Sequence, residues 1–163
     1  MRLLRWIGDK GALLLTIAWI ALAAIAVTAP ILVNISPGIA AAFYLSMKPL
    51  CHQIAERSFF IAGNKMALCA RCTGIFAGLA IFGIISLILR ERARISMRTM
   101  MIFIAPMAID GVAQIFGLWT TPNVPRFITG VLAGFGIVFW IYPIIFESNS
   151  WDLRTNRINL KED

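Results

Sequence analysis

The sequence predicts an all-α, polytopic membrane protein with four transmembrane helices. The chain has 163 residues, of which 60% are hydrophobic and 14% are charged. This charge content is too low to solvate a globular protein of this size in water. The apolar residues gather in four long runs, and about 20 apolar residues suffice to cross the hydrocarbon core of a bilayer. The lipid bilayer is therefore the first expected partner.

The four spans are expected near residues 12–33, 73–89, 99–119 and 127–146. Together they form a single transmembrane domain, residues 1–146, which is followed by a cytoplasmic tail, residues 147–163. The first run also resembles a secretory signal, because charged residues precede it and small residues lie before Pro30. Its apolar stretch is longer than that of a signal, and proline is a poor residue at a cleavage point. We therefore interpret the run as a span.

Short interfacial helices are expected between the first and second spans. Ser36 offers an N-cap, and Pro37 follows it at the first helical position. This pair predicts a short helix over residues 38–47, lying along the membrane surface. A further short helix is expected over residues Leu50–Phe59.

The positive charges predict the orientation, since cytoplasmic loops retain Lys and Arg. With the N-terminus inside, ten of the 15 Lys and Arg residues lie on the inner side and five on the outer side. This distribution predicts that both termini are cytoplasmic. The basic residues are divided among loops without an aromatic platform, so we do not expect nucleic acid as a partner. The net charge of +7 suits a protein in contact with anionic lipid.

All three cysteines and the only histidine lie within one polar stretch and the start of the second span. Cys69 and Cys72 have the two-residue separation that a tetrahedral metal ion needs, and Cys51 and His52 are the remaining soft ligands. We therefore expect a metal site formed by Cys51, His52, Cys69 and Cys72, with zinc or another soft or borderline metal as the cofactor. His52 is alternatively a support for three cysteine ligands, because adjacent ligands rarely reach one ion.

The same cysteines also allow a redox interpretation. A Cys-x-x-Cys pair at the start of a helix can cycle between dithiol and disulfide, because the helix N-terminus lowers the thiol pKa. Arg71, between Cys69 and Cys72, would add to this effect. Quinone-coupled disulfide-forming membrane enzymes have a similar layout, but they use a second cysteine pair. A plain disulfide or buried free thiols are the structural alternatives.

Asp110 marks a second candidate site, because an ionisable residue inside a span is usually partnered or functional. Gln114 lies one turn further along the same helix face. Arg126, at the start of the fourth span, is the expected countercharge of Asp110, and this pair is either structural or functional. In the functional interpretation Asp110 and Arg126 are catalytic candidates. The residues expected to bind an anionic substrate are Arg71, Gln114, Asn123, Arg126 and Thr129.

Two small-residue motifs predict a helix contact near these residues. Gly74 and Gly78 lie in the second span, and Gly130 and Gly134 lie in the fourth. Such pairs allow helices to approach closely in lipid. We therefore expect the second and fourth helices to touch near their outer ends.

These residues also carry a resemblance to a known family. The first block comprises Cys51-His52-Gln53, Glu56-Arg57-Ser58-Phe59, Gly63 and Cys69-Ala70-Arg71-Cys72-Thr73-Gly74, and the second comprises Asp110-Gly111, Gln114, Asn123, Arg126, Thr129 and Gly130. Together the blocks resemble the family of small prokaryotic membrane proteins called domain of unknown function 2085. The resemblance covers residues 45–136 and implies that both blocks belong to one site.

The sequence thus predicts a protein of the prokaryotic cytoplasmic membrane with an outward-facing metal site beside a polar pocket. The metal would activate water or polarise an oxygen of an anionic ligand, either a lipid or a small molecule. One alternative is a membrane thiol-disulfide oxidoreductase that uses Cys69 and Cys72. Another alternative is a non-catalytic subunit of a membrane complex. An oligomer or a complex partner is compatible with each of these functions.

Overall fold

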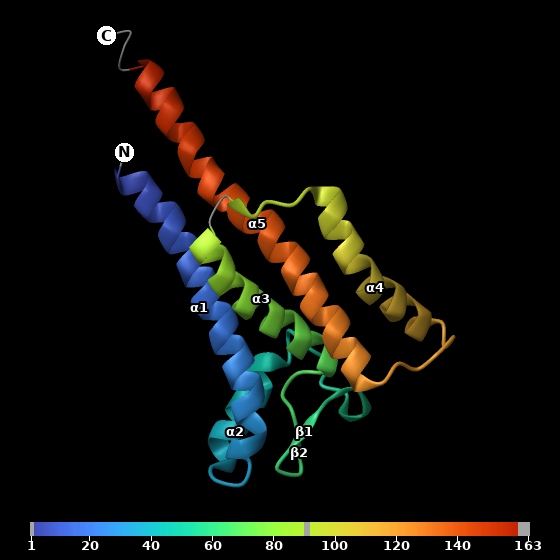
Figure 1. Ribbon diagram of the computed structural model, residues 1–163. Coiled ribbons are helices and arrows are strands. Elements are labelled where there is room, and N and C mark those ends of the chain that lie inside the picture. The colour runs from blue at the N-terminus through green and yellow to red at the C-terminus, as the bar shows by residue number, and fades with distance from the viewer. Residues whose placement is uncertain (1, 90–91, 160–163) are drawn as a thin grey trace.

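The computed structural model describes residues 2–89 and 92–159, and the side chains of residues 10–89 and 92–146. Its helices are α1 (Arg2–Leu32), α2 (Pro37–Met47), the 3-10 helix η1 (Ala55–Arg57), α3 (Ala70–Leu89), α4 (Met97–Ile115) and α5 (Asn123–Asn159), and its strands are β1 (Phe60–Ile61) and β2 (Asn64–Lys65) (Figure 1). In this part of the chain four helices are long and apolar enough to cross a membrane: 10–32 of α1, α3, α4 and 123–146 of α5. The predicted fold class, with four spans, is confirmed.

Two helix ends differ from their predicted positions. Helix α4 ends at Ile115, before the expected residue 119, because Gly117 adopts a positive φ of 67° and turns the chain. The N–H of Gly117 donates to the carbonyl of Gln114, and the N–H of Leu118 donates to that of Ala113. Helix α5 continues to Asn159, beyond the expected end of the span at residue 146. The predicted cytoplasmic tail, residues 147–163, lies entirely outside the described side chains.

The segment between α2 and α3 contains a short hairpin that the sequence analysis did not predict. The expected helix over 38–47 is present as α2, but the helix expected over Leu50–Phe59 is reduced to the single turn η1. Strands β1 and β2 then pair in antiparallel register, Phe60 with Lys65 and Ile61 with Asn64. Ala62 and Gly63 both have positive φ, as a two-residue type I′ turn requires. The Ala-Gly pair is a weak hairpin signal, so the turn was missed.

Helix α5 contacts α1, α3 and α4, and α3 lies along it in the most extensive of these contacts (Figure 1). A Cβ atom added to Gly74 would lie 2.2 Å from the carbonyl oxygen of Phe127, and one added to Gly130 would lie 2.4 Å from that of Arg71. Gly78 and Gly134 meet in the same way one turn further along. Only glycine permits two backbones to approach this closely. The predicted contact between the second and fourth helices is confirmed.

Helix α4 packs on α5 through larger side chains. The rings of Phe103 and Phe135 have centroids 4.7 Å apart, and a Cβ atom added to Gly136 would lie 3.1 Å from the Cβ of Phe103. Much of the remaining surface of α4 is exposed and apolar, including Ile109 and Ile115. Such a surface suits contact with lipid chains.

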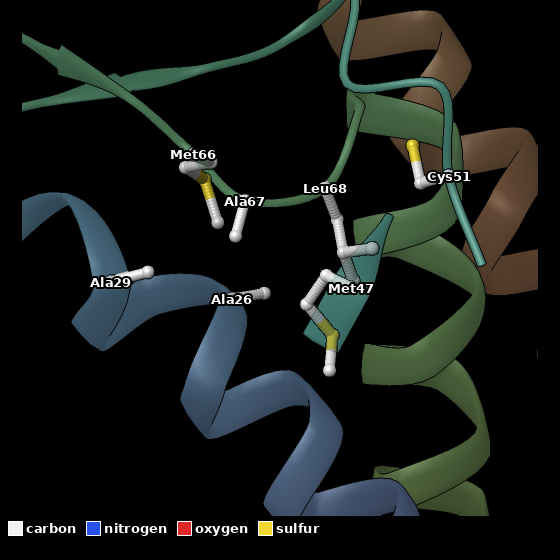
Figure 2. Packing of buried hydrophobic residues seen from close by; sticks show 7 residues of the cluster. All are labelled: Ala26, Ala29, Met47, Cys51, Met66, Ala67 and Leu68. Carbon is white, nitrogen blue, oxygen red and sulfur yellow. The ribbon is translucent and has the colours of Figure 1, made fainter. Parts of the chain in front are cut away.

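A small core at one end of the bundle fixes the segment around Cys51. Ala26 and Ala29 of α1 are fully buried against Met66 and Ala67, while Met47 and Leu68 fill the space towards Cys51 (Figure 2). The hairpin and the connection from α4 to α5 lie at this end (Figure 1). The N-terminal end of α1 and the C-terminal end of α5 lie at the opposite end of the bundle (Figure 1). The fold therefore places the hairpin segment and the connection from α4 to α5 at the same end of the predicted membrane domain.

Candidate metal centre

Three sulfur atoms meet where the segment after α2 approaches the start of α3. The Sγ atoms of Cys51, Cys69 and Cys72, here called the sulfur trio, all lie within 4.8 Å of one another, and the three thiols are free. A tetrahedral zinc ion with Zn–S bonds of about 2.3 Å holds its sulfur ligands about 3.8 Å apart. The separations within the trio are thus of the size that a single ion requires.

Gln53 holds Cys51 in position. Its side-chain amide donates to the carbonyl of Tyr44 at 2.7 Å, and its own carbonyl accepts from the Nζ of Lys65 at 2.8 Å. Its backbone has a positive φ of 55°, which is uncommon for a residue with a side chain and turns the chain sharply after His52. Gln53 was not predicted as a site residue, although it belongs to the block that carries the family resemblance.

Hydrogen bonds concentrate negative charge on Cys51. Thiol hydrogen bonds from Cys69 and Cys72 lower the pKa of Cys51, and the N–H groups of Cys69 and Gln53, 3.2 and 3.5 Å from its Sγ, act in the same direction. The pKa of Cys69 is raised, chiefly because its thiol donates to Cys51. Hydrogen bonds to a sulfur favour its thiolate form, and thiolates are the form that binds metals.

His52 does not join the sulfur trio. Its side chain is exposed, and the metal-sized group contains the three cysteines alone. It nevertheless lines the cavity beside the trio. The structure therefore reduces the expected Cys₃His set to three sulfurs, with His52 at the wall of the site.

Asp110 pairs with Arg71, and the expected ion pair with Arg126 is wrong. Arg71 Nη2 donates to Asp110 Oδ2 in the one ion pair found among the described side chains. Arg71 reaches α4 from the first turn of α3 because Gly111 leaves space for its side chain. A Cβ atom added to Gly111 would lie 3.3 Å from Arg71 Nη1. The sequence favoured Arg126 because both it and Asp110 lie near the ends of consecutive spans, whereas helix packing places Arg71 closer.

Asp110 accepts three further hydrogen bonds. Gln114 Nε2 donates to its Oδ2 at 2.8 Å, Trp119 Nε1 donates to its Oδ1 at 3.4 Å, and the hydroxyl of Thr121 also donates to Oδ1. Trp119 and Thr121 were not predicted as site residues. Their only sequence signal was their position in the polar connection just after the helix that carries Asp110.

Arg126 is buried, with 5% of its surface exposed, and it is held by neutral partners. Its Nη2 donates to Gln114 Oε1 at 3.1 Å and its Nη1 to Asn123 Oδ1 at 3.3 Å. Asn123 in turn donates to the carbonyl of Ser58 at 3.0 Å. Thr129 donates to the carbonyl of Arg126 at 3.0 Å, so its hydroxyl is used within α5. We call Arg71, Asp110, Gln114, Asn123 and Arg126 the polar network.

One cavity joins the sulfur trio to the polar network. It has a volume of about 200 Å³, and its lining includes all three cysteines, His52, Arg71, Gln114 and Arg126. A larger cavity of about 550 Å³ shares Ile54, Arg57, Gln114 and Arg126 with it and continues towards Trp119. The small cavity and the large cavity therefore share part of their walls. Residues from both halves of the sequence line each of them.

Comparisons with known proteins agree with the membrane architecture. The model of a family described as predicted membrane protein, domain of unknown function 2085, matches residues 51–140. An uncharacterised protein of Methanocaldococcus jannaschii is 46% identical over 101 residues, which are 60% of this chain and 65% of the relative. Another uncharacterised protein, of Methanothermobacter thermautotrophicus, is 32% identical over 89 residues, which are 54% of this chain and 80% of the relative. No solved structure matches the chain.

Proposed function

The chain belongs to the domain of unknown function 2085 family of predicted membrane proteins, and we propose that it is a membrane metalloprotein with a zinc ion bound by Cys51, Cys69 and Cys72. The observation that carries this proposal is the convergence of the three Sγ atoms within 4.8 Å. Two of the three come from one Cys-x-x-Cys segment and the third from a loop fixed by Gln53. The spacing of Cys69 and Cys72 is common among zinc ligands, and cysteine sulfur is a preferred ligand of zinc.

Three protein ligands leave one position of a tetrahedral ion free, as in catalytic zinc sites. The small cavity adjoins the sulfur trio, and the guanidinium of Arg126 lines the same cavity. An anionic ligand in this cavity would contact both the metal and Arg126. The metal would then activate water or polarise an oxygen of the ligand.

The polar network gives its members different roles in this proposal. Arg126 contacts the anionic ligand, and Gln114 and Asn123 hold its guanidinium. Asp110 acts as a positioning residue, because it holds both Gln114 and Arg71. Thr129 supports the first turn of α5 from within the helix.

We further propose that the site faces outward from a prokaryotic cytoplasmic membrane. The distribution of Lys and Arg supports cytoplasmic termini. The site lies at the end of the bundle opposite the N-terminal end of α1 and the C-terminal end of α5 (Figure 1). Labelling of intact cells with a membrane-impermeant thiol reagent tests this orientation. Reaction of the cysteines only after the membrane is opened would contradict it.

Elemental analysis of the purified protein tests the metal site. We expect about one equivalent of zinc in the wild-type protein, and its loss in a double variant carrying Cys69→Ser and Cys72→Ser. Replacement by Co²⁺ should give the thiolate charge-transfer absorption of a tetrahedral sulfur site. His52→Ala is the matched control, because His52 lines the cavity outside the sulfur trio and its loss should leave the metal content unchanged. Wild-type protein that takes up no metal refutes the proposal.

A thiol-disulfide oxidoreductase is the second candidate function, and it is favoured by the hydrogen bonds from Cys69 and Cys72 that lower the pKa of Cys51. A thiolate that lies within 4.8 Å of two other sulfurs is placed to attack a disulfide formed at either one. Metal-free protein whose thiols oxidise and reduce reversibly, with a mixed disulfide trapped by Cys72→Ser, would support this function. Stoichiometric metal together with thiols protected from oxidation would exclude it.

A further inference from the structure

Two arginine side chains line the small cavity with hydrogen-bond donors left over. The Nε atoms of Arg71 and Arg126 are buried and have no partner among the described residues. Arg126 also makes no ion pair with a described carboxylate, since its guanidinium is held by two amide oxygens. A buried cation whose donors are incompletely used is costly unless an anion completes its surroundings.

The charges around the cavity leave a positive excess. Arg57, Arg71 and Arg126 line it, and Asp110 is the one carboxylate that contacts any of them within the described part of the chain. A divalent ion with three thiolates adds a single negative charge, so the site with its proposed metal retains about one positive charge. An anionic ligand is therefore favoured both with the metal and without it.

The donors reach the cavity from different directions. Arg71 belongs to the first turn of α3, Arg126 to the first turn of α5, and the sulfur trio forms a third part of the wall. A carboxylate has two acceptor oxygens, which lie in one plane. A tetrahedral oxyanion presents at least three oxygens and matches donors on separate elements.

The volume limits the size of the bound group. Pockets for drug-sized ligands have volumes of about 300–1,000 Å³. The small cavity has about 200 Å³, which suits an anionic group of a few heavy atoms. The large cavity of about 550 Å³, with Ile54 and Trp119 in its wall, offers space for the rest of a larger molecule.

We propose that the small cavity binds a phosphate group, whose oxygens accept hydrogen bonds from Arg126 and Arg71 and occupy the open position of the metal ion at the sulfur trio. This inference rests on the proposed metal site for one of its three contacts. The two guanidinium contacts stand without it. A free phosphate ion and a phospholipid headgroup share this chemistry.

Phosphorus-31 NMR of inorganic phosphate with the full chain in detergent tests the proposal. In Co²⁺-loaded protein the paramagnetic ion should strongly enhance the relaxation of bound phosphate, and Zn²⁺-loaded protein should not. The effect should saturate with phosphate, and acetate should displace phosphate far less well than sulfate does. An absence of saturable binding, or equal displacement by acetate and sulfate, overturns the proposal.

Variants separate the guanidinium contacts from the metal. Arg126→Gln should weaken phosphate binding at least tenfold while the metal content stays at the wild-type value. Lys48→Gln removes an equal charge from an exposed residue that does not line either cavity, and it should leave binding unchanged. Equal phosphate binding by Arg126→Gln and wild type contradicts the inference. If Arg126→Gln does not fold, the anion competition in wild-type protein decides alone.

Metal analysis of the same samples distinguishes the two proposals. Wild-type protein without metal refutes the metal site. The phosphate inference is then tested by whether phosphate raises the unfolding temperature of the wild-type protein and not that of Arg126→Gln.

Vesicles distinguish the phosphate source. Displacement of inorganic phosphate by phosphatidic acid vesicles and not by phosphatidylcholine vesicles identifies a lipid headgroup as the ligand, whereas displacement by neither identifies free phosphate.

Discussion

Helices α3 and α4 both pack on α5, but their contacts are of different kinds. The α3–α5 contact is backbone against backbone, because Gly74, Gly78, Gly130 and Gly134 bring the two helices together. The α4–α5 contact is made by larger side chains, such as Phe103 against Phe135. Helix α4 is joined to the first turn of α3 through the ion pair between Asp110 and Arg71.

This difference separates the two halves of the site. Cys72 and Arg71 are placed by the tight glycine contact, which fixes α3 against α5 beside the sulfur trio. Asp110 and Gln114 are placed on a helix that polar side chains connect to the rest of the site. The sulfur trio should therefore be the rigid half of the site, and the polar network the half that moves when α4 moves.

Gly130→Ala should destabilise the protein more than Asp110→Asn or Gly136→Ala does. Its Cβ would lie 2.4 Å from the carbonyl oxygen of Arg71, a backbone atom that can move only with α3. We expect a loss of about 3 kcal/mol in the free energy of unfolding, at the upper end of the range for overpacked cores. Equilibrium unfolding of the detergent-solubilised protein measures it.

Gly38→Ala is the control for this prediction, because a Cβ at Gly38 meets no atom within 4 Å. It should leave stability unchanged or raise it slightly, since alanine favours the helix. If both substitutions have equal effects, the glycine contact does not determine the packing of α3 on α5.

Asp110→Asn should have an intermediate effect that is confined largely to α4. The substitution removes the charge that pairs with Arg71, and the amide offers fewer acceptor sites to Gln114, Trp119 and Thr121. A loss of about 1–3 kcal/mol is expected when buried polar groups lose a partner. Hydrogen exchange measured by mass spectrometry should increase in α4 more than in α3.

Glu56→Gln is the matched control, because Glu56 is exposed and lies outside this network. It should leave exchange in α4 unchanged. Equal exchange of α3 and α4 in Asp110→Asn would mean that the ion pair does not hold α4 in place.

Gly136→Ala should have the smallest effect and tests the α4–α5 contact directly. Its Cβ would lie 3.1 Å from the Cβ of Phe103 and 3.2 Å from the carbonyl oxygen of Met100. A shift of a few tenths of an ångström in α4 relieves both contacts, so we expect a loss of about 1 kcal/mol. A loss as large as that of Gly130→Ala, measured in the same unfolding experiment, would show that α4 is held as rigidly as α3.

The sequence predicted the spans and the helix contact because membrane helices follow simple rules. Apolar length defines α3, and its glycine spacing indicates the side that approaches α5. The proximity of the three cysteines was also predictable, because Cys69 and Cys72 lie one helical turn apart and Cys51 lies in the preceding connection.

The partners of Asp110 were not predictable in the same way. Choosing between Arg71 and Arg126 requires the rotation and relative height of α3, α4 and α5, and the hydrophobic pattern does not encode these quantities. The turn at Gln53 depends on contacts with Tyr44 and Lys65, which are separated from it by several residues in the chain. Local propensity therefore predicts neither the turn nor the hairpin that follows it.

The hydrogen bonds around Cys51 have a consequence for the kinetics of metal exchange. The polypeptide itself brings the sulfur trio together, through the N–H of Cys69, the turn at Gln53 and the packing of Met47 and Leu68. Binding an ion to such a preorganised site costs little conformational entropy, in contrast to zinc fingers that fold only around their metal. Treatment with a chelator should therefore leave the helical circular dichroism intact, and added Zn²⁺ should reload the protein in a single fast phase without refolding.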